Sequence, residues 1–248
     1  MPFAIGRLPA FLTARPTPRP VLPGQPYALM AWTGGRGLAL PSAAPVTPQM
    51  RASGTWANGN EFGCAWLADH VQQRGIDTVL RLDDRGAAGK PYGGAELQTT
   101  KTYASGRLEA SIQAVACPGV ITSLFTYTGQ PHDEIDIEFL GNDPTKVQLG
   151  YFTNGKHYAV EHLDLGFDAS KEMHSYAFEW GPDAIRWYVD GRLVKTATAA
   201  DGPLPTHPQQ LMANVWPTQG IDGWAGRFQY PGRPLEATYR NITYTPRA

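Results

Sequence analysis

From Arg51 to its carboxyl end, the chain consists of short stretches in which apolar and polar residues alternate, separated by glycine, proline, asparagine and aspartate. A period of two is typical of half-buried β-strands, because successive side chains of a strand point to opposite faces. The clearest such stretches are 106–114, 174–180, 184–189, 192–195 and 236–244. Asp190-Gly191, between two of them, indicates a two-residue hairpin turn. Strands this numerous without helical periodicity predict an all-β sandwich of two antiparallel sheets.

Proline and charge divide the chain near residue 50. Residues 1–50 contain ten of the 22 prolines and no Asp or Glu, and their four arginines give this segment a charge of +4. Because the whole chain has a net charge of -1, residues 51–248 carry -5. We expect residues 1–50 to be a poorly packed leader and residues 51–248 to be one folded domain.

The composition limits the possible partners, whereas the leader does not settle the location of the protein. A surface that neutralises many phosphates needs a basic excess, whereas this chain has 21 basic and 22 acidic residues, so no nucleic-acid partner is expected. The leader lacks the apolar run of about 7–15 residues of a secretory signal. No stretch approaches the roughly 20 apolar residues that span a bilayer, so we expect no membrane span. Cys64 and Cys117 are too few to define a disulfide framework, and the sequence leaves their pairing open.

One predicted strand, residues 133–140, carries acids at positions where strands rarely have them. Its apolar residues 135, 137 and 139 fall on one face, so Glu134, Asp136 and Glu138 fall together on the other. A solvated acidic face is the alternative interpretation. Like charges aligned on one face repel each other, however, so this pattern favours a functional carboxylate cluster.

The spacing of these acids indicates acid/base chemistry. The Cα atoms of Glu134 and Glu138 are expected about 13 Å apart, and inward-leaning side chains bring their carboxyls to roughly 5 Å. That separation is typical of retaining glycosidases, in which one carboxylate attacks the anomeric carbon and the other protonates the leaving oxygen. Asp136 would keep one glutamate ionised and raise the pKa of the other.

A metal site is the competing use of the same cluster. His132 would share the carboxylate face, whereas Asp133 would point away from it. One flat strand would need ligands from elsewhere, and no second cluster of His, Cys or Asp stands out in the sequence. We therefore expect no metal ligands here.

Residues 132–142, His-Asp-Glu-Ile-Asp-Ile-Glu-Phe-Leu-Gly-Asn, resemble the Glu-x-Asp-x-Glu signature of glycoside hydrolase family 16. The resemblance extends over about residues 54–245 and is strongest to bacterial lichenases, the endo-1,3-1,4-β-glucanases. Further matching stretches include 62–66, 123–129, 165–171, 187–191 and 212–216. The resemblance implies a concanavalin A-like β-jelly-roll sandwich with a concave substrate cleft. It also implies that Glu134 is the nucleophile, Asp136 its helper and Glu138 the general acid/base.

The same resemblance assigns eight residues to substrate binding: Asn58, Glu96, Phe125, Tyr127, His132, Asn214, Trp216 and Trp224. Some positions depart from the lichenase pattern. His132 replaces a Trp, Gln98 replaces an Arg near Glu96, and Gly150 begins a run that is Asn-Tyr-Tyr in lichenases. These changes remove hydrogen-bond donors, so the resemblance does not imply strict mixed-linkage specificity.

Two further departures concern stability. Gly94 replaces the second cysteine of the lichenase disulfide, so no bridge of that type is expected for Cys64. Arg240 replaces the Asp whose backbone oxygen binds a structural calcium in the family, which disfavours that ion. No cofactor is expected to be required, and a structural calcium is left open as the less favoured alternative.

The sequence therefore predicts an endo-acting retaining β-glucanase that hydrolyses β-1,3-1,4-glucan, or a related β-glucan or exopolysaccharide, through a covalent glycosyl-enzyme. A transglycosylase of β-glucan or xyloglucan type would use the same chemistry. A non-catalytic, lectin-like polysaccharide-binding module is the alternative from another class, although it would need no acid pair. We expect a monomer that is secreted or periplasmic, because polymeric substrates lie outside the cell.

Overall fold

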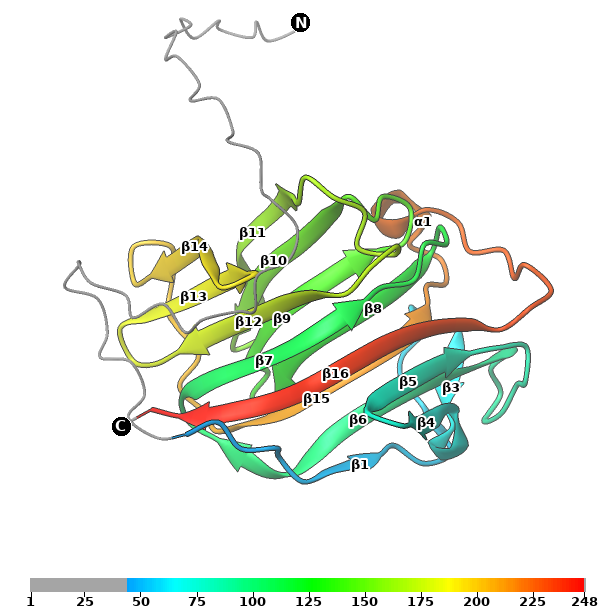
Figure 1. Ribbon diagram of the computed structural model, residues 1–248, viewed down its shortest axis with the longest axis horizontal. Coiled ribbons are helices and arrows are strands. Elements are labelled where there is room, and N and C mark those ends of the chain that lie inside the picture. The colour runs from blue at the N-terminus through cyan, green and yellow to red at the C-terminus, as the bar shows by residue number, and fades with distance from the viewer. Residues whose placement is uncertain (1–43, 248) are drawn as a thin grey trace, which may run out of the picture. The chain divides into compact units, whose positions relative to one another are not determined.

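The computed structural model describes residues 44–247, which form two β-sheets packed against each other (Figure 1). The predicted leader, residues 1–50, lies mostly outside the described residues. Within its described part, Val46 forms an antiparallel bridge with Tyr244, and strand β1 begins at Met50. No helix in the described part of the chain is long and apolar enough to cross a membrane.

The first sheet has nine strands: β1 (Met50–Ala52), β2 (Trp56–Ala57), β3 (Cys64–Trp66), β6 (Tyr92–Tyr103), β8 (Val120–Tyr127), β9 (Glu134–Leu140), β10 (Lys146–Thr153), β11 (Lys156–Asp164) and β15 (Gln209–Pro217). Their order is β11-β10-β9-β8-β15-β6-β3-β2, with β1 paired to β6. Strand β9, which carries the three acids, therefore lies inside the sheet with a neighbour on each side.

The second sheet has seven strands: β4 (Val71–Arg74), β5 (Asp77–Leu82), β7 (Gly106–Gln113), β12 (His174–Trp180), β13 (Ala184–Val189), β14 (Arg192–Thr198) and β16 (Leu235–Pro246). Their order is β14-β13-β12-β7-β16-β5-β4. The described helices are a 3-10 turn, Ala68–His70, and α1 (Asp222–Ala225).

The sequence-based prediction of an all-β sandwich is confirmed, and the clearest predicted strands correspond to β7, β12, β13, β14 and β16. Asp190 and Gly191 have φ angles of 48° and 73°, the left-handed conformation that a tight hairpin turn of this type requires at both central residues. One pair was not predicted: β3 and β6 run parallel. The chain between them forms β4 and β5 in the other sheet, a connection long enough for parallel pairing.

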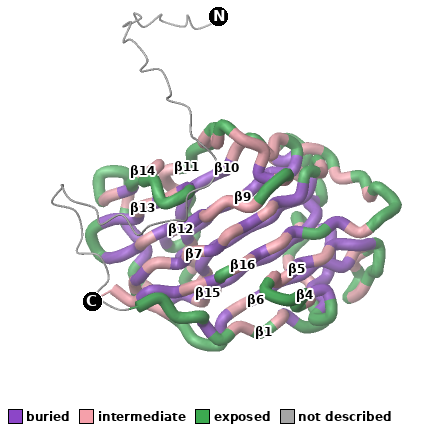
Figure 2. The backbone as a smooth tube through the Cα atoms, viewed as in Figure 1, coloured by how far each residue is buried: buried purple, intermediate pink, exposed green. Residues whose placement is uncertain are grey.

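The hydrophobic core lies between the sheets and takes alternate residues from their strands, as the burial of β7 illustrates (Figure 2). On β9, Ile135, Ile137 and Phe139 are at most 1% exposed and belong to this core. Burial of each such side chain contributes roughly 1.5–3 kcal/mol. The apolar face of β9 is therefore held against the second sheet, which directs the acids to the opposite face.

Two polar groups of the second sheet reach through the core to the backbone of the first. The Trp187 indole on β13 donates a hydrogen bond to the carbonyl oxygen of Asp136, at 3.0 Å. The Tyr239 hydroxyl on β16 donates to the carbonyl oxygen of Ser123, at 2.8 Å. Both side chains are fully buried. The second sheet therefore positions the backbone of the strands that carry the acids.

We expect Trp187→Phe to lower the free energy of unfolding by roughly 2–4 kcal/mol, because it removes buried volume and leaves the Asp136 carbonyl without this donor. Urea denaturation measures the loss. Trp180→Phe is the matched control, since the Trp180 indole nitrogen is buried and has no hydrogen-bond partner among the described residues. Equal losses in the two variants would contradict a stabilising role for the Trp187 hydrogen bond.

Candidate active site

The carboxyls of Glu134, Asp136 and Glu138 line one cavity of about 330 Å³. The prediction that these three acids share a face of β9 is therefore confirmed. His132 lines the same cavity, whereas Asp133 is fully buried and bonded to His207 and the backbone of Asn154, so their predicted directions are also confirmed.

Burial and mutual repulsion change the proton affinities of this row. Burial, followed by the charges of Glu134 and Glu138, raises the pKa of Asp136 well above its ordinary value. Burial, followed by the charge of Glu134, raises the pKa of Glu138 to about 8. The Gln148 amide acts in the opposite direction, because it donates to Oε2 of Glu138 at 2.7 Å. A glutamate that keeps its proton at neutral pH is suited to act as a general acid.

The neighbouring strands complete the cavity. The residues that contribute to it lie directly opposite the acids, or opposite each other, in the strand pairing. On β8, Tyr127, Phe125 and Ser123 pair with Glu134, Asp136 and Glu138 respectively. On β15, Gln210, Met212 and Asn214 extend the same rows, and Gln98 and Glu96 of β6 pair with Met212 and Asn214. The cavity is therefore a regular patch on one face of the sheet.

Seven of the eight predicted substrate-binding residues line this cavity: Asn58, Glu96, Phe125, Tyr127, His132, Asn214 and Trp216. Trp224 does not line this cavity, because it belongs to α1 and lies against β10. Its indole donates to Oε1 of Gln148 at 2.8 Å, and it lines a neighbouring cavity of about 260 Å³. Since Gln148 also binds Glu138, Trp224 is linked to the acid row through one side chain.

Sequence reasoning missed six residues of the site: Trp56, Phe62, Ser123, Gln148, Gln210 and Met212. Three of them lie two positions from a residue that was predicted: Trp56 from Asn58, Ser123 from Phe125 and Met212 from Asn214. The period of two along each strand would have found these three. Phe62 belongs to a loop and stacks on Trp216 with 4.1 Å between ring centroids, a contact that only the fold creates.

Glu96 is a buried carboxyl that has no cationic partner within residues 44–247. It is 3% exposed, and its Oε1 accepts a hydrogen bond of 2.6 Å from Ser53, whose hydroxyl in turn accepts one from Gln98. Burial is the main cause that raises the pKa of Glu96 to about 7. Gln98, the residue that replaces the arginine of the lichenase pattern, supplies no charge to oppose this rise.

We expect Glu96→Gln to make the protein relatively more stable as the pH rises. The pKa of the folded state, about 7, exceeds the ordinary value of 4.5, so stability from protonated Glu96 is present below pH 4.5 and is lost as the pH approaches 7. Glutamine stays neutral, and the variant should therefore gain roughly 3 kcal/mol relative to wild type across this range. Chemical denaturation at several pH values measures the difference, and a constant difference would contradict the prediction.

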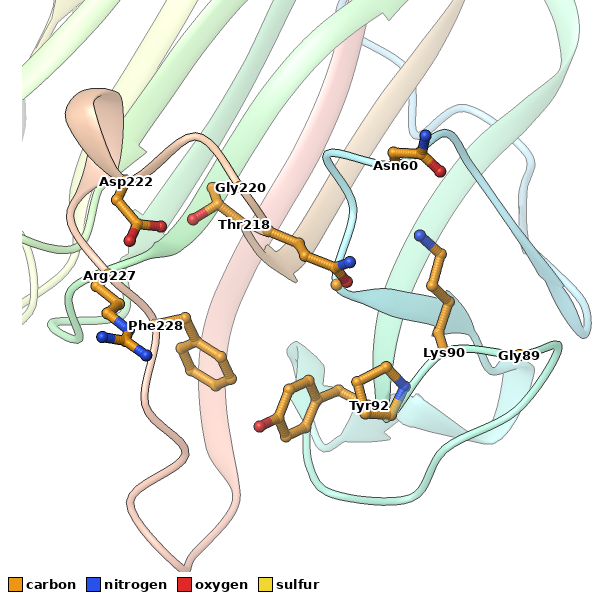
Figure 3. A pocket seen from close by; sticks show the side chains of 12 residues that line it. Asn60, Gly89, Lys90, Tyr92, Thr218, Gly220, Asp222, Arg227 and Phe228 are labelled. Carbon is orange, nitrogen blue, oxygen red and sulfur yellow. The ribbon is translucent and has the colours of Figure 1, made fainter.

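A larger hollow of about 760 Å³ lies away from the acid row. Figure 3 shows its lining, which includes Tyr92, Lys90, Arg227 and Phe228. The rings of Tyr92 and Phe228 contact each other edge to face, with 5.0 Å between centroids. None of the three acids of β9 lines this hollow, so the smaller cavity is the candidate active site.

The structure bears on the metal and disulfide expectations. No three His, Cys, Asp or Glu side chains between residues 44 and 247 are grouped as a metal site. At the position implied for calcium, the Arg240 guanidinium forms a bidentate pair with Asp77 at 2.7 and 3.1 Å. Cys64 and Cys117 are free thiols. A Cβ atom at Gly94 would lie 2.6 Å from Sγ of Cys64, so this glycine leaves room for the thiol.

A row of three acids in which the pKa values of Asp136 and Glu138 are raised, set in an aromatic-lined cavity on one face of a β-sandwich, is typical of the class of glycoside hydrolases. The comparisons with known proteins agree. The model of the glycosyl hydrolases family 16 matches residues 58–232. The chain belongs to this family.

Relatives and solved structures within this family are similar over most of their length. A beta-glucanase of Brevibacillus brevis is 41% identical over 200 residues, which cover 78% of this chain and 76% of the relative. A beta-glucanase of Bacillus subtilis is 42% identical over 195 residues, 77% and 78% of the two chains. The structure of the Bacillus licheniformis beta-glucanase superposes with a TM-score of 0.74 at 37% identity, covering 86% of this chain and all of that one. A prokaryotic beta-1,3-1,4-glucanase (lichenase) from a mouse hindgut metagenome gives 0.74 at 39% identity, covering 79% and 92%.

Proposed function

We propose that this glycoside hydrolase is an endo-acting retaining β-glucanase whose substrate is β-1,3-1,4-glucan. The observation that carries the proposal is the row Glu134, Asp136 and Glu138, in which burial and repulsion keep Glu138 protonated near neutral pH. The names of the similar proteins, beta-glucanase and lichenase, support the choice of substrate.

In the first step, the Glu134 carboxylate attacks the anomeric carbon while the glycosidic C–O bond breaks. Glu138 transfers its proton to the leaving oxygen, which departs as a sugar hydroxyl. In the second step, a water molecule attacks the same carbon, Glu138 takes a proton from it, and the ester bond to Glu134 breaks. Two displacements restore the β configuration and return both carboxyls to their starting states.

The charged side chains of the cavity favour a neutral polymer as the substrate. Among the described residues that line it are four carboxyls, those of Glu96, Glu134, Asp136 and Glu138, and no Lys or Arg. An anionic polysaccharide would find no cationic side chain among them with which to pair its acid groups. The rings of Trp56, Phe62, Phe125, Tyr127 and Trp216 offer apolar faces on which the C–H faces of pyranoses can pack. These features favour an uncharged β-glucan over an acidic exopolysaccharide.

A panel of polymers tests the proposal. We expect the protein to release oligosaccharides from barley β-glucan and lichenan, to act less on laminarin and xyloglucan, and to leave an acidic exopolysaccharide intact. Nuclear magnetic resonance of the fresh product should show the β-anomer first. Cleavage of the acidic polymer alone would contradict the proposed substrate, and initial release of the α-anomer would contradict the retaining mechanism.

We propose further that the enzyme acts outside the cytoplasm as a monomer. A polymeric glucan does not cross the membrane, and the cavity is lined by residues of one chain. Cell fractionation and size-exclusion chromatography test these two statements separately.

A further inference from the structure

His132 makes a direct contact with the proposed nucleophile. Its Nε2 lies 2.5 Å from Oε2 of Glu134, and the two side chains are 25% and 19% exposed. A hydrogen bond to a carboxylate within a partly buried site is stronger than one between neutral groups. The contact therefore restrains the orientation of the carboxylate that is proposed to attack the sugar.

The imidazole of His132 is itself held in place by aromatic rings. It contacts the edge of Tyr127, with 5.2 Å between ring centroids, and stacks on Phe152 at 4.6 Å and 16°. Phe152 is stacked in turn on His157 at 4.0 Å and 8°. Tyr127 and Phe152 are also the residues that pair with Glu134 on the two neighbouring strands. Three adjacent strands thus enclose both partners of the hydrogen bond.

The backbone around His132 is also held. The carbonyl oxygen of His132 accepts a hydrogen bond of 2.8 Å from the backbone N–H of Gly155. The next residue, Asp133, is fully buried and accepts from the backbone N–H groups of Asn154 and Thr206, at 3.0 Å each. These anchors allow the side chain of residue 132 little freedom to leave the cavity.

We propose that His132 is a positioning residue for Glu134: its Nε2–H donates to Oε2 of the carboxylate and leaves Oε1 directed at the anomeric carbon. This inference rests on the proposed function, and it gives His132 a role other than binding the substrate. When the glycosyl-enzyme is hydrolysed, the same donor stabilises the Glu134 carboxylate as it departs. Where the lichenase pattern has a tryptophan, this chain thereby places an imidazole nitrogen against the nucleophile.

Three variants of His132 separate the effect of the hydrogen-bond donor from that of the ring. His132→Phe keeps a ring between Tyr127 and Phe152 but removes the donor, and we expect kcat on lichenan to fall roughly 10- to 100-fold with KM nearly unchanged. His132→Gln places an amide N–H at a similar reach, and it should recover most of kcat. His132→Leu is a second variant without a donor, and its kcat should fall like that of His132→Phe.

A covalent probe reports on the nucleophile itself. When the Glu134 carboxylate attacks the epoxide of an epoxyalkyl β-cellobioside, a C–O bond of the epoxide breaks, its oxygen takes the proton of Glu138, and an ester to Glu134 forms. Intact-mass spectrometry measures the rate at which this adduct forms. We expect wild type and His132→Gln to be labelled at Glu134 at similar rates, and His132→Phe roughly 10- to 100-fold more slowly. A purely structural role for His132 would change thermal stability without this selective effect of the donor.

The matched control is His174→Phe. His174 also stacks on a phenylalanine, Phe167, and contacts a carboxylate, that of Asp190 at 2.8 Å, but it belongs to β12 of the second sheet. Its variant should keep wild-type kcat and labelling. Unchanged kcat in His132→Phe, a rise in KM alone, or equal losses in His132→Phe and His132→Gln would overturn the inference. Absence of labelling and hydrolysis in the wild type would instead contradict the proposed function.

Discussion

Glu134→Ala should lower kcat on lichenan by about 10⁴-fold or more, because the first displacement has no other carboxylate in position to form the glycosyl-enzyme. Asp136 cannot replace it readily, since burial raises the pKa of Asp136 and so disfavours the carboxylate form that the attack requires. Reducing-sugar release from lichenan measures the loss. Thermal unfolding of the variant shows that the loss does not come from a failure to fold.

Azide supplies a second readout for this variant. A small anion can enter the space vacated by the Glu134 side chain and attack the anomeric carbon directly, with Glu138 still protonating the leaving oxygen. A single displacement inverts the configuration, so we expect an α-glycosyl azide as product. Glu161→Ala is the control, because Glu161 lies on β11, is exposed and pairs with Lys195 at 2.6 Å. Activity close to wild type in Glu134→Ala would contradict the assignment of the nucleophile.

Glu138→Ala should show a loss that depends on the leaving group. On lichenan, where the departing sugar oxygen needs a proton, we expect kcat to fall about 10²- to 10⁴-fold. On an aryl β-glycoside with a dinitrophenolate leaving group, which departs without a proton, the first step should be nearly unaffected. Stopped-flow measurement of the phenolate burst separates this step from the slower hydrolysis of the glycosyl-enzyme.

The pH profile gives an independent test of the same residue. Because the pKa of Glu138 is raised to about 8, its proton is present below that pH and is lost above it. The kcat/KM of the wild type on lichenan should therefore fall as the pH rises through about 8. The variant, assayed for the phenolate burst, should lack this limb. The role of Glu138 as the general acid would be contradicted if Glu138→Ala kept the fall in rate above pH 8. It would also be contradicted if the variant lost activity equally on lichenan and on the aryl glycoside.

Much of the fold followed from local patterns. Strands such as 174–180 and 184–189 were predicted to their ends, because alternation and turn residues act within a few positions along the chain. The parallel pairing of β3 with β6 was not predicted, since it joins segments that are separated by two strands of the other sheet. The hydrogen bonds that Trp187 and Tyr239 donate were likewise not predicted, because each joins a side chain of one sheet to the backbone of the other.

The candidate site was likewise predicted only in part. Alternation alone placed Glu134, Asp136 and Glu138 on one face, and the resemblance to family 16 supplied seven residues that line the cavity. Neither could reveal the contact between His132 and Glu134, which depends on rings from β8 and β10. Nor could they reveal the hydrogen bond from Ser53 to Glu96. Ser53 follows β1 in the chain, and only the pairing of β1 with β6 brings it to Glu96.

The sequence by itself determined which residues form strands, which faces are apolar, and that three acids share one of them, because the geometry of a single strand decides these properties. The tertiary structure decided the proton affinities of Glu96 and Glu138. Their pKa values are raised because packed neighbours exclude water from them and no Lys or Arg is among the described residues that line the cavity, and burial of this kind exists only after the sheets have assembled.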